Sequence, residues 1–415
     1  MSLGKDKLLS IFLLFAFFVF GLYPLIPESF ESFTVIILAL SSLLMFVVFY
    51  KDNQMYLKRS FIISSAIFIL FFLSAIYSSD TARAFKKLET MSSLIILPLI
   101  FYVFLSRVNL NKQKLKAIFL KIYFLSNFIY SLLSILVFYN YENKKYLNKD
   151  SNFFRNALID VPLIGEHPIY VSIFLALAFL IGFTFYSRCN NKWYNYAFLA
   201  VGQISMFILI ILLMSKSVIC ALFVSGIVWF VSRKKKAFYV IVCISSLVVA
   251  LIFMLPKSNN RFSNFFKKET YSSVDMNNST SIRFSILKCN LKLLKENPII
   301  GYGVGDVQSL LDACYTKENF KFKKGEFNSH NQYFFVWLSC GLLGVFVFFG
   351  CLLYYFKNAI ENKDYLMLSI ITLYCIVFIF ENILSRQSGV ILFSFIMNLF
   401  VFSNKKLKNN SVTYL

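Results

Sequence analysis

Long apolar runs alternate with short polar segments along most of the chain. The runs are continuous in Phe, Leu and Ile and do not alternate with polar residues, so each is predicted to be a helix and not a barrel strand. Each run has roughly 20 residues, the length at which a helix crosses about 30 Å of hydrocarbon. The pattern predicts an all-α, polytopic integral membrane protein with about twelve transmembrane helices. We place them at residues 8–26, 32–50, 60–78, 91–106, 117–139, 168–187, 194–214, 217–232, 237–255, 332–356, 365–381 and 388–403.

The basic residues between these runs predict the orientation of the chain. If the N-terminus is cytoplasmic, every inside segment contains Lys or Arg, as expected where short loops retain positive charge. Both termini are then cytoplasmic, and residues 256–331 form a large helical loop on the other side of the membrane. We expect a bundle of about nine spans (1–255), this loop (256–331) and about three further spans (332–415) to act as one functional unit.

Composition excludes two other classes of protein. The chain has 415 residues, of which 58% are hydrophobic and 15% are charged, and a water-soluble domain is less apolar. The net charge of +22 does not indicate nucleic-acid binding, because most Lys and Arg residues lie in the short loops that set topology. The eight Cys residues contain no Cys-x-x-Cys pair, so we expect neither a zinc nor an iron–sulfur site and no cofactor.

The large loop is predicted to contain two helices joined by a glycine-rich corner. The first helix begins after Ser279, a natural N-cap, and ends at Pro298; the second runs from near Asp306 to about Tyr315. A dinucleotide-binding fingerprint would need a strand before the glycines, and here a helix precedes them. Two interpretations stay open: a structural corner, or a backbone nest for phosphate at the start of the second helix. The corner reads Gly301-Tyr302-Gly303-Val304-Gly305-Asp306.

Cys289 and Cys314 lie one on each of these two predicted helices. An antiparallel corner would bring them together, and a disulfide can form in an oxidising compartment. Two reduced, buried thiols fit the pattern equally well.

Four polar residues at the predicted outer face are candidates for chemistry. His167 and His330, the only histidines, precede the predicted spans at 168–187 and 332–356. An imidazole there would suit a proton acceptor, although two residues can share one face by chance. Arg283 lies on the first loop helix, where a solvated surface position is the simpler interpretation. Lys216 lies at the turn between two spans, where a charge either has a role or extends to the interface.

Several motifs in a fixed order resemble the O-antigen ligase and polymerase superfamily, which comprises bacterial inner-membrane proteins with many spans and a large periplasmic loop. The resemblance covers most of the chain, and the ordered set is more specific than any one motif. It rests on Leu73–Ser78, Lys87–Glu89, Leu97–Leu99, His167–Tyr170, Arg283, Asn297–Asp306, Asn328–Tyr333 and Gly341–Gly344.

The resemblance implies a glycosyltransferase that moves a glycan from undecaprenyl diphosphate to an acceptor by one inverting displacement, without a metal ion. The outer loops contain no Asp-x-Asp pair, which fits this implication. Such a reaction needs positive charge at the leaving diphosphate and a proton acceptor at the acceptor hydroxyl. Arg283 matches the loop arginine of the family, and His330 matches its histidine. Lys216 stands where the family usually has arginine, so a forked contact with phosphate would be replaced by a point charge.

The resemblance also suggests supporting roles for a second group of residues, namely His167, Asn331, Gly303, Gly305 and Asp306. The expected partners are an undecaprenyl-diphosphate-linked glycan as donor, a lipid A–core or another glycan as acceptor, and membrane lipids, with no nucleic acid.

Three functions are compatible with the sequence. A ligase would pass the glycan to lipid A–core, and a polymerase would pass it to another repeat unit. We favour the ligase because of the His167–Tyr170 motif and the Gly303–Asp306 corner. A transporter or flippase is the alternative from another class, but transporters place ionisable residues at mid-membrane, whereas here they gather at one face.

Overall fold

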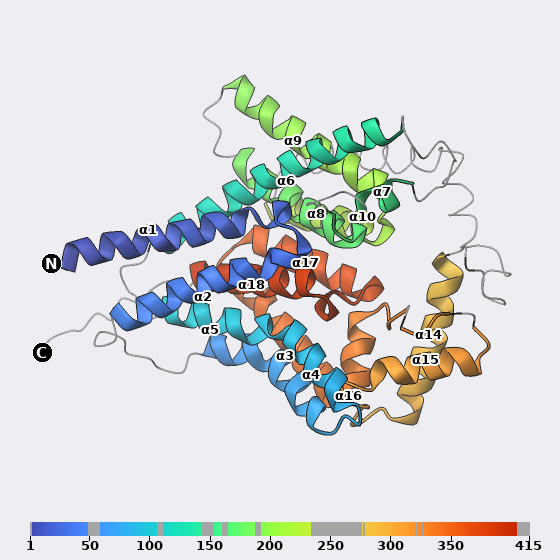
Figure 1. The fold of residues 1–415 in the computed structure, drawn as a ribbon. Helices are drawn as coiled ribbons and strands as arrows, with labels where there is room; N and C mark the ends of the chain where they lie inside the picture. Colours follow the sequence, from blue (N-terminus) through green and yellow to red (C-terminus); the bar gives the residue numbers. More distant parts are fainter. Residues whose placement is uncertain are drawn as a thin grey trace, which may run out of the picture.

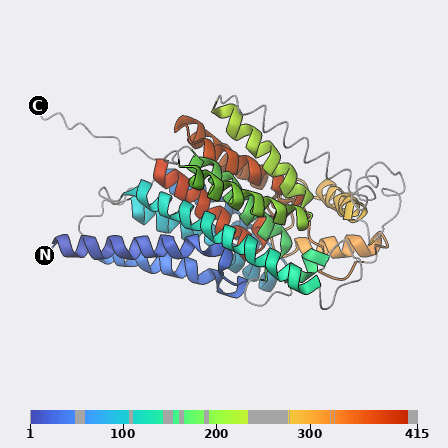
Figure 2. The ribbon, with the colours of Figure 1, turned by 90° about the horizontal axis from the view of Figure 1, so that it is seen from above.

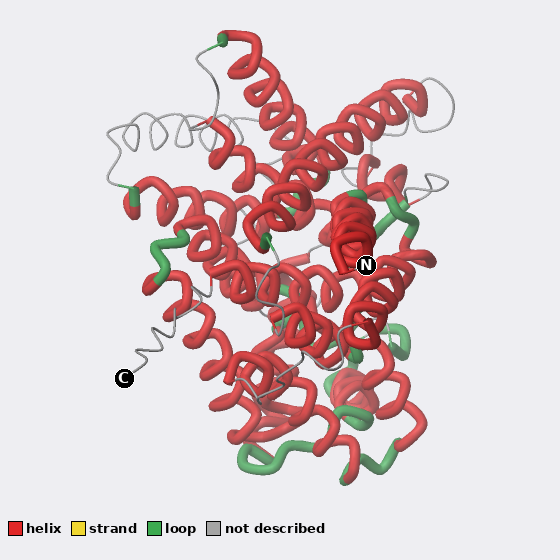
Figure 3. Tube along the Cα trace, turned by 90° about the vertical axis from the view of Figure 1, so that its left-hand side faces the viewer, coloured by secondary structure: helices red, strands yellow, loops and turns green. Residues whose placement is uncertain are grey.

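All regular secondary structure among the residues that the computed structural model describes is helical (Figure 3). Seven of the helices in this part of the chain are long and apolar enough to cross a membrane. The predicted all-α, polytopic membrane class is therefore confirmed. The described residues are 2–48, 59–105, 111–142, 153–159, 165–186, 192–233, 276, 279–320, 322–325 and 327–404.

The helices follow the predicted apolar runs and add short amphipathic elements between them. The 3-10 helices are η1 (Tyr23–Leu25), η2 (Glu28–Phe30) and η4 (Ile383–Ser385). The α-helices are α1 (Ser2–Gly21), α2 (Glu31–Val48), α3 (Arg59–Ile76), α4 (Thr81–Met91), α5 (Ser93–Leu105), α6 (Lys112–Glu142), α7 (Phe153–Ile159), α8 (Pro168–Tyr186), α9 (Trp193–Leu212), α10 (Lys216–Ser232), α14 (Ser279–Glu296), α15 (Val307–Lys317), α16 (Gln332–Glu361), α17 (Tyr365–Phe380) and α18 (Gln387–Asn404).

Two apolar helices agree closely with the predicted spans although each is shorter than 18 residues. Helix α10 has 17 residues and α17 has 16, against the predictions 217–232 and 365–381. The predicted span at 237–255 lies outside the described residues, so the number of about twelve spans stays a prediction. The predicted hairpin between the seventh and eighth spans is present, because α9 ends at Leu212 and α10 begins at Lys216.

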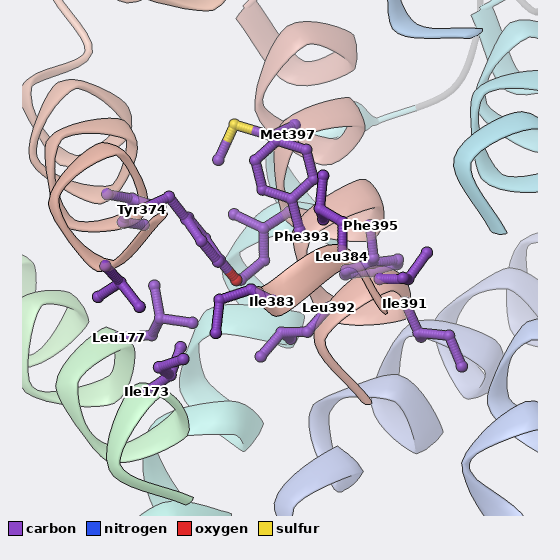
Figure 4. Close-up of a cluster of buried hydrophobic side chains, with 14 of the residues drawn as sticks. Ile173, Leu177, Tyr374, Ile383, Leu384, Ile391, Leu392, Phe393, Phe395 and Met397 are labelled. Atoms are coloured by element: carbon purple, nitrogen blue, oxygen red, sulfur yellow. The ribbon is translucent and has the colours of Figure 1, made fainter. Parts of the chain in front are cut away.

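Helices α8 and α18 form the centre of the bundle. Their spans are 72% and 89% buried, whereas the spans that contain α2 and α3 are only 39% and 33% buried. Figure 4 shows Phe393 of α18 close to Tyr374 of α17, with Ile173 and Leu177 of α8 in the same cluster. A helix that is apolar on every side suits such a buried position, and the exposed apolar faces of the outer helices suit lipid.

The two helices of the large loop lie at the end of the bundle opposite to the start of α1 and the end of α18 (Figures 1 and 2). Their bounds, Ser279–Glu296 for α14 and Val307–Lys317 for α15, agree with the two helices predicted for the loop. A disulfide joins Cys289 of α14 to Cys314 of α15, with Cα atoms 5.9 Å apart. Of the two alternatives for these cysteines, the structure contains the disulfide.

A kink in α16 receives the corner between α14 and α15. Gly341 interrupts α16 with a φ of 64°, in the left-handed region that favours glycine. A Cβ at Gly341 would lie 2.0 Å from the carbonyl oxygen of Ile299, so no other residue fits this approach. The amide of Leu342 donates to the same carbonyl at 3.0 Å. The loop carbonyl of Ile299 thus accepts a hydrogen bond that a carbonyl of α16 would accept in an unbroken helix.

The same insertion satisfies the carbonyl groups that the kink releases. Tyr302 N–H donates to the carbonyl of Leu338 at 2.7 Å, and Gly303 N–H donates to that of Ser339 at 3.0 Å. The Tyr77 hydroxyl of the α3–α4 connection lies 2.9 Å from the carbonyl of Ser339 as well. Buried carbonyls need such partners, so the large loop and α16 form one hydrogen-bonded unit.

Candidate active site

Glu381 joins Arg283 and His330, the two residues with the strongest sequence support. One carboxylate oxygen of Glu381 accepts a hydrogen bond from Nη2 of Arg283, and the other lies 3.3 Å from Nδ1 of His330. Arg283 comes from α14, His330 from the turn before α16, and Glu381 from the residue that follows α17 (Figure 1). Three segments distant in sequence therefore meet at the end of the bundle that carries the large loop.

The backbone at His330 is held in an unusual conformation. His330 has a φ of 43°, in the left-handed region, and its N–H donates to Oδ1 of Asn328 at 2.9 Å. The carbonyl of Ser329 accepts from Nδ2 of Asn290 on α14 at 3.0 Å. Strained backbone of this kind persists only where its surroundings enforce it, and it is concentrated at functional sites.

Asn331, predicted as a supporting residue, fixes the start of α16. Its side-chain oxygen accepts from Phe334 N–H at 3.0 Å, and its side-chain nitrogen donates to the carbonyl of Ile379 at 2.9 Å. The first contact is an N-cap, and the second attaches the start of α16 to the end of α17. Asn331 thereby sets the distance between His330 and Glu381.

Glu381 is a buried carboxylate that is kept ionised. Burial favours its protonated form, but the hydrogen bond to His330 and the positive charge of Arg283 outweigh burial, so the pKa of Glu381 is lowered. A carboxylate can only accept hydrogen bonds, so the ring proton of His330 faces it on Nδ1. The imidazole then presents Nε2 away from Glu381, as a proton acceptor needs.

Arg283 and His330 are both accessible to a substrate, whereas Glu381 is not. The side chains of Arg283 and His330 are 39% and 25% exposed, and that of Glu381 is 8% exposed. Glu381 is therefore placed to orient its two partners and not to contact substrate itself.

A second polar group surrounds His167 at the start of α8. Glu166 accepts from His167 N–H at 2.7 Å through one oxygen and from the Ser388 hydroxyl at 3.0 Å through the other. Burial and the charge of Glu28 raise the pKa of Glu166 to about 7, against the lowering effect of its two hydrogen bonds. This carboxyl group therefore titrates near neutral pH.

His167 is a neutral imidazole near pH 7. Burial and the positive charges of Arg386 and Arg155 lower the pKa of His167 to about 4. The charges of Glu381 and His330 also act on it, so His167 and the first cluster share one electrostatic environment. Nδ1 of His167 is buried and has no hydrogen-bond partner among the described residues. Such an orphaned nitrogen is available to a ligand or water.

Lys216 lies on the His167 side of this region. It is the first residue of α10, and the hydroxyl of the preceding Ser215 is hydrogen-bonded at 2.7 Å to that of Ser172 in the first turns of α8. The first turns of α8 and α10 therefore contact each other, and His167 and Lys216 belong to these two helix starts.

Gly303, Gly305 and Asp306 have structural tasks in the corner. A Cβ at Gly303 would lie 2.4 Å from Oγ of Ser78, and a Cβ at Gly305 would lie 2.3 Å from the carbonyl oxygen of Asp80. The Asp306 carboxylate accepts from the N–H groups of Ser79 and Asp80 at 2.6 and 2.9 Å. These contacts bind the corner to the α3–α4 connection.

The contacts of this corner favour the structural interpretation over a phosphate nest. Gly303 N–H donates to Ser339, and Gly305 N–H donates to the hydroxyl of Ser78 at 3.1 Å. A phosphate nest needs amides that point at the anion, and these two already have protein partners.

Sequence reasoning missed Glu381, Glu166 and Arg386. The available signal for Glu381 was a charge directly after an apolar span. Glu166 directly precedes His167, and that adjacency was the available signal for it. Among the described residues, no group of three His, Cys, Asp or Glu side chains could hold a metal ion.

The comparison with known families agrees with the ordered motifs. No curated protein matches the chain. Residues 201–349 match the family model described as O-antigen ligase, a region that contains Lys216, Arg283, His330 and the Gly341 kink. This domain supports the O-antigen ligase superfamily, which is the one that the ordered motifs resemble.

Proposed function

We propose that the protein is an O-antigen ligase-like glycosyltransferase. It would move a glycan from undecaprenyl diphosphate to lipid A–core or a similar acceptor on the periplasmic face of the bacterial inner membrane. The observation that carries this proposal is the contact of Glu381 with both Arg283 and His330. It joins a cation suited to a diphosphate with an imidazole suited to a hydroxyl.

In this proposal His330 is the base. Nε2 takes the proton from the acceptor hydroxyl while the hydroxyl oxygen attacks the anomeric carbon of the donor. The bond from that carbon to the diphosphate oxygen breaks, and undecaprenyl diphosphate leaves with the bonding electron pair. Glu381 stabilises the imidazolium that forms, as a buried carboxylate beside a catalytic histidine does. A single displacement of this kind inverts the anomeric centre.

Arg283 would stabilise the leaving diphosphate. Negative charge grows on the phosphate oxygens as the bond breaks, and a guanidinium held in place there lowers the barrier without a metal ion. Glu381 uses Nη2, and a guanidinium has further N–H groups for phosphate. Lys216 would add a second positive charge from the His167 side.

The disulfide supports a periplasmic location for the large loop. Disulfides persist in oxidising compartments such as the periplasm, and the Cys289–Cys314 bond joins the two loop helices. With the loop outside, the basic inside segments make both termini cytoplasmic. The bundle at 1–255, the loop at 256–331 and the spans at 332–415 would then act together, because Arg283 and His330 come from the loop and Glu381 from the last part.

A repeat-unit polymerase would use the same residues with another acceptor, and one experiment separates the two functions. The gene is deleted cleanly in its host, and lipopolysaccharide is resolved on a gel. Loss of all capped core, with accumulation of lipid-linked polymer, supports the ligase. Core capped with a single repeat unit identifies a polymerase, and an unchanged pattern contradicts both.

A further inference from the structure

A basic cavity lies at the end of the bundle opposite to Glu381. It has a volume of about 640 Å³ and is formed by the start of α6, the ends of α8, α10 and α18, and the α16–α17 turn. The candidate active site uses the other ends of α8, α10, α16, α17 and α18. The cavity is therefore separated from that site by the length of the transmembrane helices.

The charged residues of the cavity are mostly cations. Lys114, Lys116, Arg233 and Lys363 line it, and Asp364 is the only acid among its described lining residues. Four positive charges against one negative charge give the lining a net charge of +3. Cavities lined by one sign of charge beside low-dielectric walls concentrate counter-ions, so this one attracts anions.

Two of these cations are held in fixed positions. Nζ of Lys116 lies 2.6 Å from a carboxylate oxygen of Asp364 and 3.9 Å from the ring centroid of Phe400. The guanidinium of Arg233 lies 4.1 Å from the ring centroid of Trp229. Stacking on an aromatic ring restricts the side chain and so keeps its positive charge at one place in the lining.

The wall of the cavity is amphipathic. Leu120, Leu366 and the indole of Trp229 lie beside the cations, and Lys114 and Lys363 are exposed at its rim. Basic pockets between transmembrane helices on this side of a membrane suit phosphorylated lipid headgroups. A soluble phosphate would use the same cations but would gain nothing from the apolar wall.

We infer that this cavity binds the phosphate group of an anionic ligand, with the headgroup of a phospholipid in the adjoining leaflet as the occupant that its amphipathic wall favours. The inference does not depend on the reaction at the other end. A lipid headgroup bound here would contact both α6 and the α16–α17 turn.

Thermal unfolding of the delipidated full-length protein in detergent tests the inference. The added probes are phosphatidylglycerol, phosphatidylcholine and inorganic phosphate. A ligand that binds only the folded state raises the Tm with concentration. We expect phosphatidylglycerol to raise the Tm and phosphatidylcholine to leave it unchanged. The double variant Lys114→Gln, Lys363→Asn should weaken the apparent affinity for phosphatidylglycerol roughly tenfold or more, because two of four cations are removed.

The variants are chosen to keep the fold. Lys363 has a φ of 52°, and asparagine tolerates that region better than most residues. Lys357→Gln is the matched control, because Lys357 is 68% exposed on α16 at the same end and does not line the cavity. It should respond to phosphatidylglycerol as the wild type does.

The outcomes separate the two sources of phosphate. A response to inorganic phosphate that the double variant loses, without a response to phosphatidylglycerol, would uphold the phosphate site and assign it to a soluble anion. An equal loss in Lys357→Gln and the double variant would overturn the inference in favour of unspecific charge. If the double variant does not fold, the wild-type protein is cross-linked with a photoreactive phosphatidylglycerol and the cross-linked residues are identified. Cross-links at 111–120 and 362–366 support the site, and cross-links only elsewhere overturn it.

Discussion

The Glu381 carboxylate lies 3.3 Å from Nδ1 of His330, although α16 and α17 separate the two residues along the chain. The contact fixes which ring nitrogen can face an acceptor, and it places a negative charge where an imidazolium would form. Glu381 is a positioning residue in this arrangement, so its removal should slow the reaction at His330 although the base itself stays in place.

Replacement of Glu381 by Gln should lower the rate of glycan transfer by roughly 10²-fold or more, since the base loses its orientation and the partner of its charged form. Glu381→Asp should recover part of the rate, because it keeps a carboxylate that can accept from Nδ1 of His330. A wild-type rate in Glu381→Gln, or no recovery in Glu381→Asp, measured with purified protein, would contradict this role.

His330→Ala should abolish transfer while protein level and membrane insertion stay normal. The matched control is His167→Ala, which should have a milder effect because His167 is a half-buried residue at the rim of the site. Both variants are assayed as purified proteins with the lipid-linked donor and the acceptor. Transfer by His330→Ala at the wild-type rate would mean that another outer-face residue is the base, with His167 examined first.

The two candidate diphosphate contacts should respond differently to exchange of Arg and Lys. Arg283→Ala should abolish transfer, and Arg283→Lys should recover little, because a lysine cannot hold Glu381 and a phosphate with one planar fork. We expect a loss of roughly tenfold to a hundredfold in kcat/KM for Arg283→Lys. Lys216→Arg should be neutral or favourable, since it restores the usual family residue. Full activity in Arg283→Lys would argue against a forked contact.

Glu166 should make stability depend on pH between about 4.5 and 7. Its pKa is raised to about 7 in the folded protein, so its contribution is complete below pH 4.5 and is lost as the pH rises through 7. The predicted loss is about 3 kcal/mol. His167 acts in the opposite direction, because its lowered pKa of about 4 makes its contribution fall as the pH falls below 6.5.

The two effects offset each other in the wild type, and Glu166→Gln separates them. Thermal unfolding of this variant should show stability that rises with pH over this window, because only the contribution of His167 remains. Glu318→Gln is the control: Lys288 and Lys292 lower the pKa of Glu318 to about 2, so its removal should leave the slope between pH 5 and 7 unchanged. Identical slopes for wild type and Glu166→Gln would contradict the prediction.

The disulfide should stabilise the outer loop. Cys289 and Cys314 are 25 residues apart, and closing a loop of that size contributes about 3 kcal/mol through the entropy of the unfolded chain. Cys289→Ser should therefore lower the Tm, whereas Cys220→Ser, at an exposed free cysteine, should not. Alkylation of the denatured wild type without reductant should leave both loop cysteines unmodified. Labelling of both would refute the bond.

The apolar runs predicted where the helices are, but not which helices pack against one another. The spans that contain α2 and α8 have the same mean hydropathy of 2.2, yet the first is 39% buried and the second is 72% buried. Lipid is as apolar as the interior of a protein, so the sequence carries little information on which apolar face meets which. Arg283 and His330 could be found from motifs. Glu381 could not be assigned to them, because its role depends on which helix ends meet.

The glycine corner shows the same limit. The spacing predicted a turn between two helices, and the structure contains it. The reason for Gly303 and Gly305, however, lies in Ser78 and Asp80, more than two hundred residues earlier in the chain. A local sequence pattern can identify a turn, but it cannot identify distant residues whose close approach leaves no room for a side chain.

The insertion of the corner into α16 makes the large loop unsuitable as an exchangeable module. A chimaera that took residues 279–331 from a relative and kept its own α16 would have to match three backbone hydrogen bonds and one glycine across the junction. In such proteins, sequence changes in the loop that alter acceptor preference should therefore be accompanied by matching changes in α16. Residue 332 marks a change in hydropathy along the chain, but the backbone contacts between the corner and α16 continue across it.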